Sequence, residues 1–95
     1  MKGKETIRIG LHAARSTGER VIWAEIEEKR AVIRNMADLK MKFGNGARLS
    51  WFLISNGIRQ ELDRNDPRIE QEGFLLRIPE KDAVKGVRAE CVLST

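Results

Sequence analysis

Basic side chains on two neighbouring segments are the residues of this sequence best suited to bind a ligand. Residues 39–43 and 47–54 both alternate apolar and polar side chains, which is typical of strands, and the Gly-Asn-Gly between them is typical of a three-residue hairpin loop. In the resulting register Lys42 lies directly opposite Arg48, with Lys40 beside them. Because like charges directly across a strand pair repel, we expect either an acidic group of the fold or an external anion to offset them.

Aromatic side chains are expected close to these cations. Strand alternation puts Trp51 on the apolar face, where it is predicted to be core, and Phe52 on the face of the cations. An exposed ring beside Lys and Arg is the layout of single-stranded nucleic-acid sites, where bases stack and phosphates meet cations. Alternatively, residues 55–72 cover Phe52, or Phe52 anchors a protein interface. The predicted nucleic-acid-binding residues are Lys40, Lys42, Arg48, Arg8, Arg34 and Phe52, with Trp23 as a second stacking surface.

Few residues are suited to acid–base or metal chemistry. His12 is the only histidine, and a single histidine does not make a conventional zinc site. Glu25 and Glu27 would share a strand face and could hold Mg²⁺ or divide acid–base work, but ion pairs with neighbouring cations explain them better. Cys91 alternates with apolar residues, which predicts an inert core thiol. The sequence therefore predicts no catalytic residue, no metal and no cofactor.

Length, composition and charge limit the class of protein. The 95 residues, 41% hydrophobic and 34% charged, predict a single domain over residues 1–95. One cysteine allows no internal disulfide and fits a reducing compartment. The first residues lack the apolar run of a signal peptide, and the longest uncharged run, residues 49–58, is far shorter than the roughly 20 residues of a membrane span. We therefore expect a cytoplasmic protein with no membrane contact.

The net charge of +4 is unevenly distributed along the chain. Residues 1–48 contain eleven Lys and Arg and six Asp and Glu, a net charge of +5, whereas residues 49–95 contain seven and eight, a net charge of −1. A basic excess in one half is typical of proteins with a polyanionic partner, although it also fits ordinary surface solvation.

The predicted fold is a β-rich α+β domain. Hydrophobic periodicity predicts strands over residues 6–13, 74–78 and 87–93, in addition to the hairpin, and a helical segment over about residues 55–72. Residues 20–37 favour two strands that turn at about residues 27–30, with a single helix over 19–36 as the alternative. These elements predict a strongly bent antiparallel sheet or a small barrel, with the helical segment on one side or at one end.

Three functions remain open from the sequence. The first is a small non-enzymatic binding or regulatory module whose first candidate partner is a nucleic acid. The second is a protein–protein module (a subunit, adaptor or inhibitor), which includes a homodimer formed through an exposed strand edge. The third is a small hydrolase or nuclease that would use Glu25, Glu27 and His12.

Overall fold

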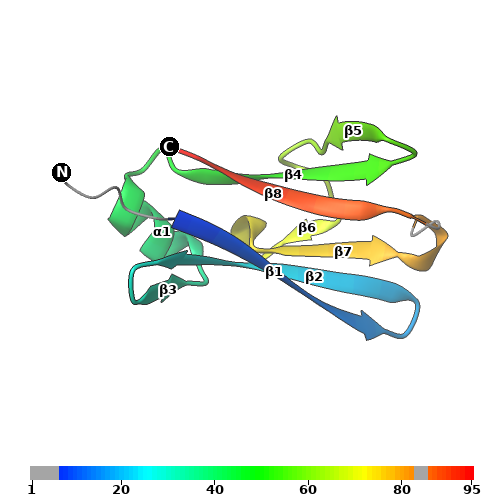
Figure 1. The fold of residues 1–95 in the computed structure, drawn as a ribbon, viewed down its shortest axis with the longest axis horizontal. Coiled ribbons are helices and arrows are strands. Elements are labelled where there is room, and N and C mark those ends of the chain that lie inside the picture. Colours follow the sequence, from blue (N-terminus) through cyan, green and yellow to red (C-terminus); the bar gives the residue numbers. More distant parts are fainter. Residues whose placement is uncertain (1–6, 83–85) are drawn as a thin grey trace.

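A computed structural model of the protein describes residues 7–82 and 86–95. Two antiparallel sheets face each other, and a helix, α1 (Met36–Phe43), lies at one end of the pair (Figure 1). Sheet A contains β1 (Ile7–Ser16), β2 (Glu19–Glu28), β3 (Ala31–Ile33), β6 (Ile69–Glu70) and β7 (Leu75–Pro79). Sheet B contains β4 (Arg48–Ser55), β5 (Ile58–Glu61) and β8 (Arg88–Ser94). Two short 3-10 turns, Gln71–Gly73 and Glu80–Asp82, flank β7.

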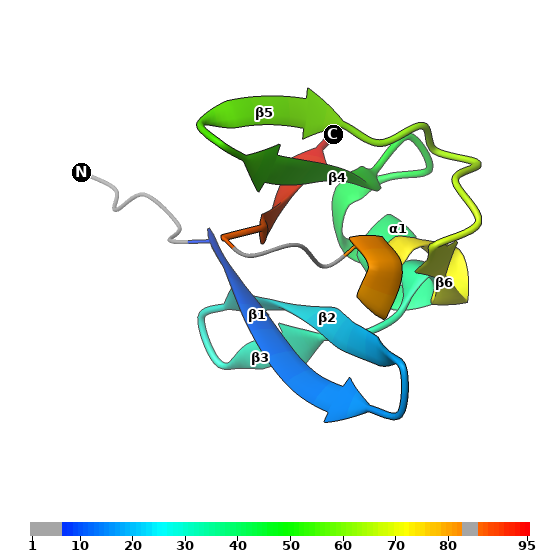
Figure 2. The ribbon, with the colours of Figure 1, turned by 90° about the vertical axis from the view of Figure 1, so that its right-hand side faces the viewer.

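The hydrophobic core lies between the sheets, which Figure 2 shows as an upper and a lower layer. Strand alternation builds it, because in β2 the side chains of Ile22, Ala24 and Ile26 are buried while their neighbours are not. Trp51 supplies the largest buried side chain from the opposite sheet, as its apolar alternation predicted. Cys91 also packs against the core, as predicted. No helix in the described part of the chain has the length and apolar content to cross a membrane.

The prediction of a β-rich α+β fold is confirmed. Residues 20–37 contain the two strands that the sequence favoured, β2 and β3, and Lys29 turns between them with a φ of 55°. The strands predicted over residues 6–13, 74–78 and 87–93 correspond to β1, β7 and β8. The sheet does not close into a barrel, because sheets A and B keep separate strand ladders.

The strand predicted over residues 39–43 is wrong, because this segment belongs to helix α1. Asn35 caps the helix, since its side chain accepts a hydrogen bond of 2.8 Å from the backbone N–H of Asp38. Leu39 and Phe43 are four residues apart and face the core together, so their spacing fits a helical period as well as an alternating one. Gly44, with a φ of 103°, ends the helix, so the glycine-containing loop is a helix terminus and not a hairpin loop.

The predicted Lys42–Arg48 pair therefore does not exist across a strand ladder. Arg48 begins β4, where it pairs with Ser94, and Lys42 lies on α1. The ammonium of Lys42 lies 2.9 Å from the carboxylate of Glu28, whose side chain is only 3% exposed. The sequence left open whether an acidic group of the fold or an external anion offsets the charge of Lys42. In the structure the acidic group is Glu28.

The helical segment predicted over residues 55–72 is also wrong. Asn56 and Gly57 adopt φ values of 54° and 79°, the left-handed geometry of a tight Asn-Gly hairpin turn, and they join β4 directly to β5. The spacing of Ile54 and Ile58 that suggested a helix instead brackets this turn, where Ser55 pairs with Ile58. The only helix of more than one turn in residues 7–82 and 86–95 is α1.

The connection between β5 and β6 is held by a local ion pair. The carboxylate of Asp66 accepts hydrogen bonds of 2.9 Å from the backbone N–H, the Nε and the Nη2 of Arg68. These bonds, chiefly those from the Arg68 guanidinium, hold the pKa of the Asp66 carboxyl below its usual value of 3.8. Partial burial raises the same pKa, but the hydrogen bonds outweigh it.

This ion pair predicts a pH-dependent contribution to stability. Because the folded-state pKa of Asp66 is lowered, its contribution is present above the unfolded-state pKa and is lost as the pH falls through the folded-state pKa. We expect Asp66→Asn to lower the free energy of unfolding by about 1–2 kcal/mol at neutral pH. Urea unfolding at neutral pH and below the pKa of aspartate measures this, with Asp63→Asn as the matched control. A loss of equal size at both pH values would contradict the prediction.

Candidate functional site

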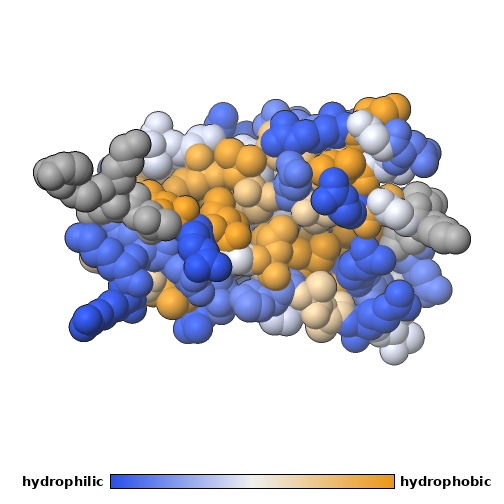
Figure 3. All heavy atoms as spheres, in the orientation of Figure 1, coloured by the Kyte–Doolittle hydropathy of each residue, from blue (hydrophilic) through white to orange (hydrophobic). Residues whose placement is uncertain are grey.

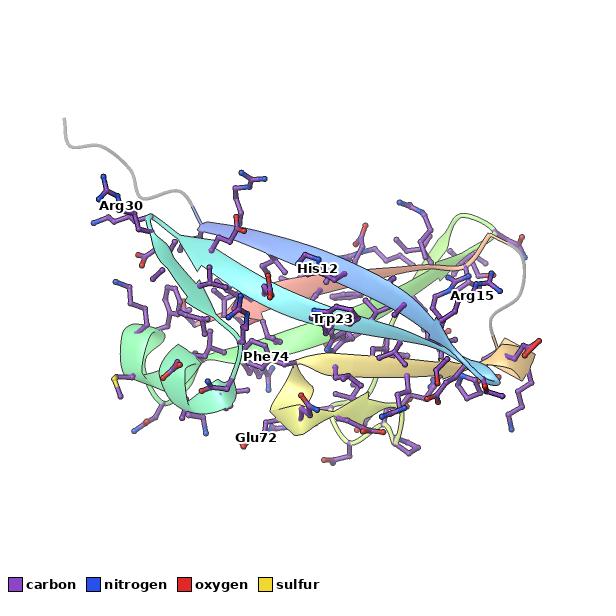
Figure 4. The ribbon with its side chains drawn as sticks, turned by 90° about the horizontal axis from the view of Figure 1, so that it is seen from below. His12, Arg15, Trp23, Arg30, Glu72 and Phe74 are labelled. Carbon is purple, nitrogen blue, oxygen red and sulfur yellow. The ribbon has the colours of Figure 1, made fainter. Side chains whose placement is uncertain are left out.

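Polar and aromatic side chains meet on the outer face of sheet A. His12 of β1 and Trp23 of β2 stack with their ring centroids 5.7 Å apart and an interplanar angle of 22°. Figure 4 shows the two rings side by side in the middle of this face. The Nε2 of His12 lies 3.0 Å from Oε1 of Glu25, and the Nε of Arg34 donates to Oε2 of the same carboxylate over 2.7 Å. We call these four residues the Trp23 cluster.

The β1–β2 hairpin brings the cluster together. Thr17 and Gly18 form a two-residue turn, with a φ of 78° at Gly18, which pairs the strands continuously from Ser16 and Glu19 onward. In that register His12 lies opposite Trp23, and Gly10 lies opposite Glu25.

The carboxylate of Glu25 organises the charges of the cluster. The pKa of Glu25 lies below its usual value of 4.5, mainly because Arg34 donates a hydrogen bond to the carboxylate. Burial raises this pKa by less than Arg34 lowers it, and His12 lowers it a little further. Both carboxylate oxygens are engaged, so Glu25 is built to position its partners. The guanidinium of Arg34 remains 67% exposed and has further N–H donors that can meet an anion.

A hollow of about 380 Å³ opens beside the cluster. It lies where β7 and β3 use the same edge of β2, since β7 pairs with residues 19–23 and β3 with residues 26–28. The hollow in the gap between the two partners is lined by residues from both sides, namely Trp23, Ala24, Glu25, Arg34, Gln71, Phe74 and Leu75, of which Phe74 is itself buried. The hollow therefore combines an aromatic wall with a cation and a side-chain amide, which suits a planar, partly polar ligand.

One rim of the hollow is a strained turn. Gln71, Glu72 and Gly73 have φ values of 52°, 54° and 97°, so three consecutive residues adopt the left-handed region. For residues other than glycine this geometry costs roughly 1–2 kcal/mol each. The indole N–H of Trp51 donates to the carbonyl of Gly73 over 2.7 Å, which ties the turn to the core.

The residues predicted to bind nucleic acid do not form a single surface. Arg8, Arg34, Lys40 and Lys42 come from the end of the molecule that contains α1 and the β2–β3 turn, where Arg8 pairs across the ladder with Glu27 (Figure 1). Arg48 and Phe52 belong to sheet B, where Arg48 begins β4 at the α1 end and Phe52 lies farther along the strand. Their role in binding stays a prediction.

Phe52 is not a free stacking surface. It lies half-buried on the outer face of sheet B, and the guanidinium carbon of Arg59 sits 3.8 Å from the centroid of its ring. Arg59 is held there by Glu90, at 2.8 Å from its Nε. The segment 55–72 therefore covers Phe52 in part, as the sequence allowed, but through a strand and a cation–π contact.

From the sequence, Arg34 and Trp23 were candidates for the nucleic-acid site, and His12 and Glu25 belonged to the hydrolase alternative. The contact among all four was not predicted. The Thr17-Gly18 turn is the sequence signal that could have predicted this contact, because a two-residue loop fixes which residues of the two strands face each other. The partner of His12 that the sequence did not reveal is Glu25. No group of three or more His, Cys, Asp or Glu within the described ranges is arranged to hold a metal ion.

Comparison of the chain with protein-family models, with curated proteins and with solved structures finds no match. The function of the protein is therefore inferred from the geometry of the Trp23 cluster and its surroundings.

Proposed function

We propose that the protein is a small binding module without catalytic activity, and that its ligand is a single-stranded nucleic acid bound on the outer face of sheet A. The observation that supports this most directly is the Trp23 cluster, in which a partly exposed indole stacked on an imidazole and an exposed arginine side chain border one hollow. Bases stack on such aromatic surfaces without regard to sequence, and cations beside them meet the phosphates.

Charge near the cluster supports the same ligand. The exposed cations Arg8, Arg30, Arg34 and Lys40 lie toward the α1 end of the molecule, and Figure 4 shows Arg30 at the turn beyond β2. A strand that stacks on Trp23 could follow this end with its phosphates. Glu25 and Glu27 lie on the same face and would repel the closely spaced phosphates of a duplex. A flexible single strand, which carries fewer phosphates per length, therefore fits this face better.

The experiment is fluorescence anisotropy with labelled single- and double-stranded oligonucleotides over a series of salt concentrations. We expect Trp23→Leu to weaken single-strand binding about tenfold, since stacking contributes roughly 1–3 kcal/mol per base. We expect Arg34→Ala to lower the slope of log affinity against log salt by about one, because one phosphate contact is lost.

Two matched controls lie on sheet B. Phe52→Leu removes an aromatic ring, and Arg88→Ala removes an exposed cation, without touching the Trp23 cluster. Both should bind like the wild type. Absence of binding at low salt, or loss of binding in Phe52→Leu with Trp23→Leu unaffected, would contradict the proposed site.

A further inference from the structure

Strand β1 leaves one edge of sheet A unprotected. Its ten residues pair with β2 in an unbroken register, and no other strand in the described part of the chain pairs with its second edge. Exposed edges in natural proteins are commonly shielded by Pro, by charged side chains or by a bulge, and β1 has none of these from Ile9 to Ala14, since its charged residues Arg8 and Arg15 lie toward its two ends. A long, regular edge of this kind is suited to pair with another strand.

The side of the molecule next to this edge is apolar. Figure 3 shows an apolar band there, in the view that has β1 and β8 in front. Ile7 and Leu11, on the inner face of β1, are 42% and 38% exposed, which is high for large apolar side chains that point toward the interior of a sandwich, and Val92, on the outer face of β8, is 38% exposed. Between β1 and β8 a hollow of about 560 Å³ is lined by Ile7, Ile9, Phe43, Cys91, Val92 and Leu93. Contiguous exposed apolar surface marks an interaction site.

We propose that the occupant of this side is a second copy of the chain, whose β1 pairs antiparallel with β1 about a two-fold axis at Leu11. In this register Leu11 faces its own copy, Ile9 faces Ala13, and His12 faces Gly10, so near the axis large side chains meet small ones apart from the central leucines. Arg8 then faces Ala14, and Arg15 faces Ile7, so no like charges are opposed. Such self-complementarity in size and charge favours a second β1 over an unrelated strand.

The dimer would cover the apolar surface between β1 and β8, which is exposed in a single copy of the chain. Ile9 and Leu11 of the incoming strand would lie on the inner side of the extended sheet, next to the hollow between β1 and β8. The two-fold axis keeps both Trp23 clusters on the same outer face, three strand spacings or roughly 14 Å apart. The inference does not depend on the proposed nucleic-acid function, because it rests only on the edge and the apolar side.

The test is the molar mass in sedimentation equilibrium of the wild type, Leu11→Lys and Leu11→Glu. The wild type should reach twice the chain mass of 10.8 kDa. Each variant places like charges opposite each other at the axis and should be a monomer, while a mixture of equal amounts should restore the dimer mass. Ile58→Lys is the matched control, because Ile58 is 69% exposed on β5, the edge strand of sheet B. This variant should remain a dimer.

A cross-linking variant tests the same contact without a charged substitution, in case the charged variants do not fold. Leu11→Cys places two thiols directly opposite each other and should form a disulfide-linked dimer under mild oxidation, whereas Ile58→Cys should not. The natural Cys91 should not interfere, because burial raises the pKa of its thiol to about 12 and few thiolates form at neutral pH. A wild type that stays monomeric at every concentration, a dimer that survives Leu11→Lys, or absence of cross-linking in Leu11→Cys would each overturn the proposal.

Discussion

Replacing Trp51 with alanine is expected to lower the free energy of unfolding by about 4 kcal/mol, the largest effect of any single substitution considered for this protein. Trp51 is fully buried between the two sheets and pairs with Cys91 across the β4–β8 ladder. Its removal leaves a large cavity and also frees the carbonyl of Gly73 from its indole partner. Since a domain of this kind is stable by only about 5–15 kcal/mol, Trp51→Ala should unfold at much lower urea concentrations than the wild type.

A second variant separates the two contributions of Trp51. Trp51→Phe keeps most of the apolar volume but loses the hydrogen bond to Gly73, so we expect it to cost about 1–2 kcal/mol. For a chain of this length that corresponds to a fall of roughly 10 °C in the midpoint of thermal unfolding. Equal stability of Trp51→Phe and the wild type would show that the strained turn at Gln71–Gly73 holds without the indole.

Replacing Lys42 with methionine is expected to lower the free energy of unfolding by about 2 kcal/mol, less than for a fully buried ion pair because the Lys42 side chain is 46% exposed. The substitution keeps the apolar stem on α1 but removes a positive charge that lies 2.9 Å from the buried carboxylate of Glu28. A carboxylate that stays buried with less compensating charge destabilises the fold. Urea unfolding at neutral pH measures the loss.

Two further variants make this result specific. Lys40→Met changes an exposed lysine on the same helix and should alter stability by less than about 0.5 kcal/mol. Glu28→Gln combined with Lys42→Met removes both charges and should recover most of the loss. If Lys42→Met were as stable as Lys40→Met but bound nucleic acid more weakly, Lys42 would serve a ligand and not the fold.

The sheet strands could be predicted from local patterns because each has one buried face. In β2 the apolar Ile22, Ala24 and Ile26 recur at every second position and form the face toward the core, although the other face contains Val21 and Trp23 besides glutamates. Residues 39–43 show where this reasoning fails. Leu39 and Phe43 satisfy both an alternating and a helical period, whereas Met41 fits only the alternating one and is 83% exposed. The Asn35 cap, which favours the helix, lies outside the alternating stretch.

The candidate site could be predicted only as separate residues. His12 and Glu25 are thirteen positions apart, and their contact depends on the register of the β1–β2 hairpin. The hollow depends on more distant chain segments, since Phe74 and Gln71 reach Trp23 only because β7 pairs with β2. Phe52 was recognised as an aromatic on an outer face, but the cation that covers it, Arg59, became visible only with the β4–β5 turn.

By itself the sequence determined the β-rich class, most strand positions and the burial of Trp51, because these follow from the short-range alternation of apolar residues and from glycine-containing turns. The tertiary structure alone decided that Lys42 pairs with Glu28, that the Trp23 cluster assembles on one face, and that one edge of β1 has no partner strand within residues 7–82 and 86–95. The reason is physical: local periodicity specifies which face of a segment is buried, whereas the partner of that segment is selected by packing among faces far apart in the chain.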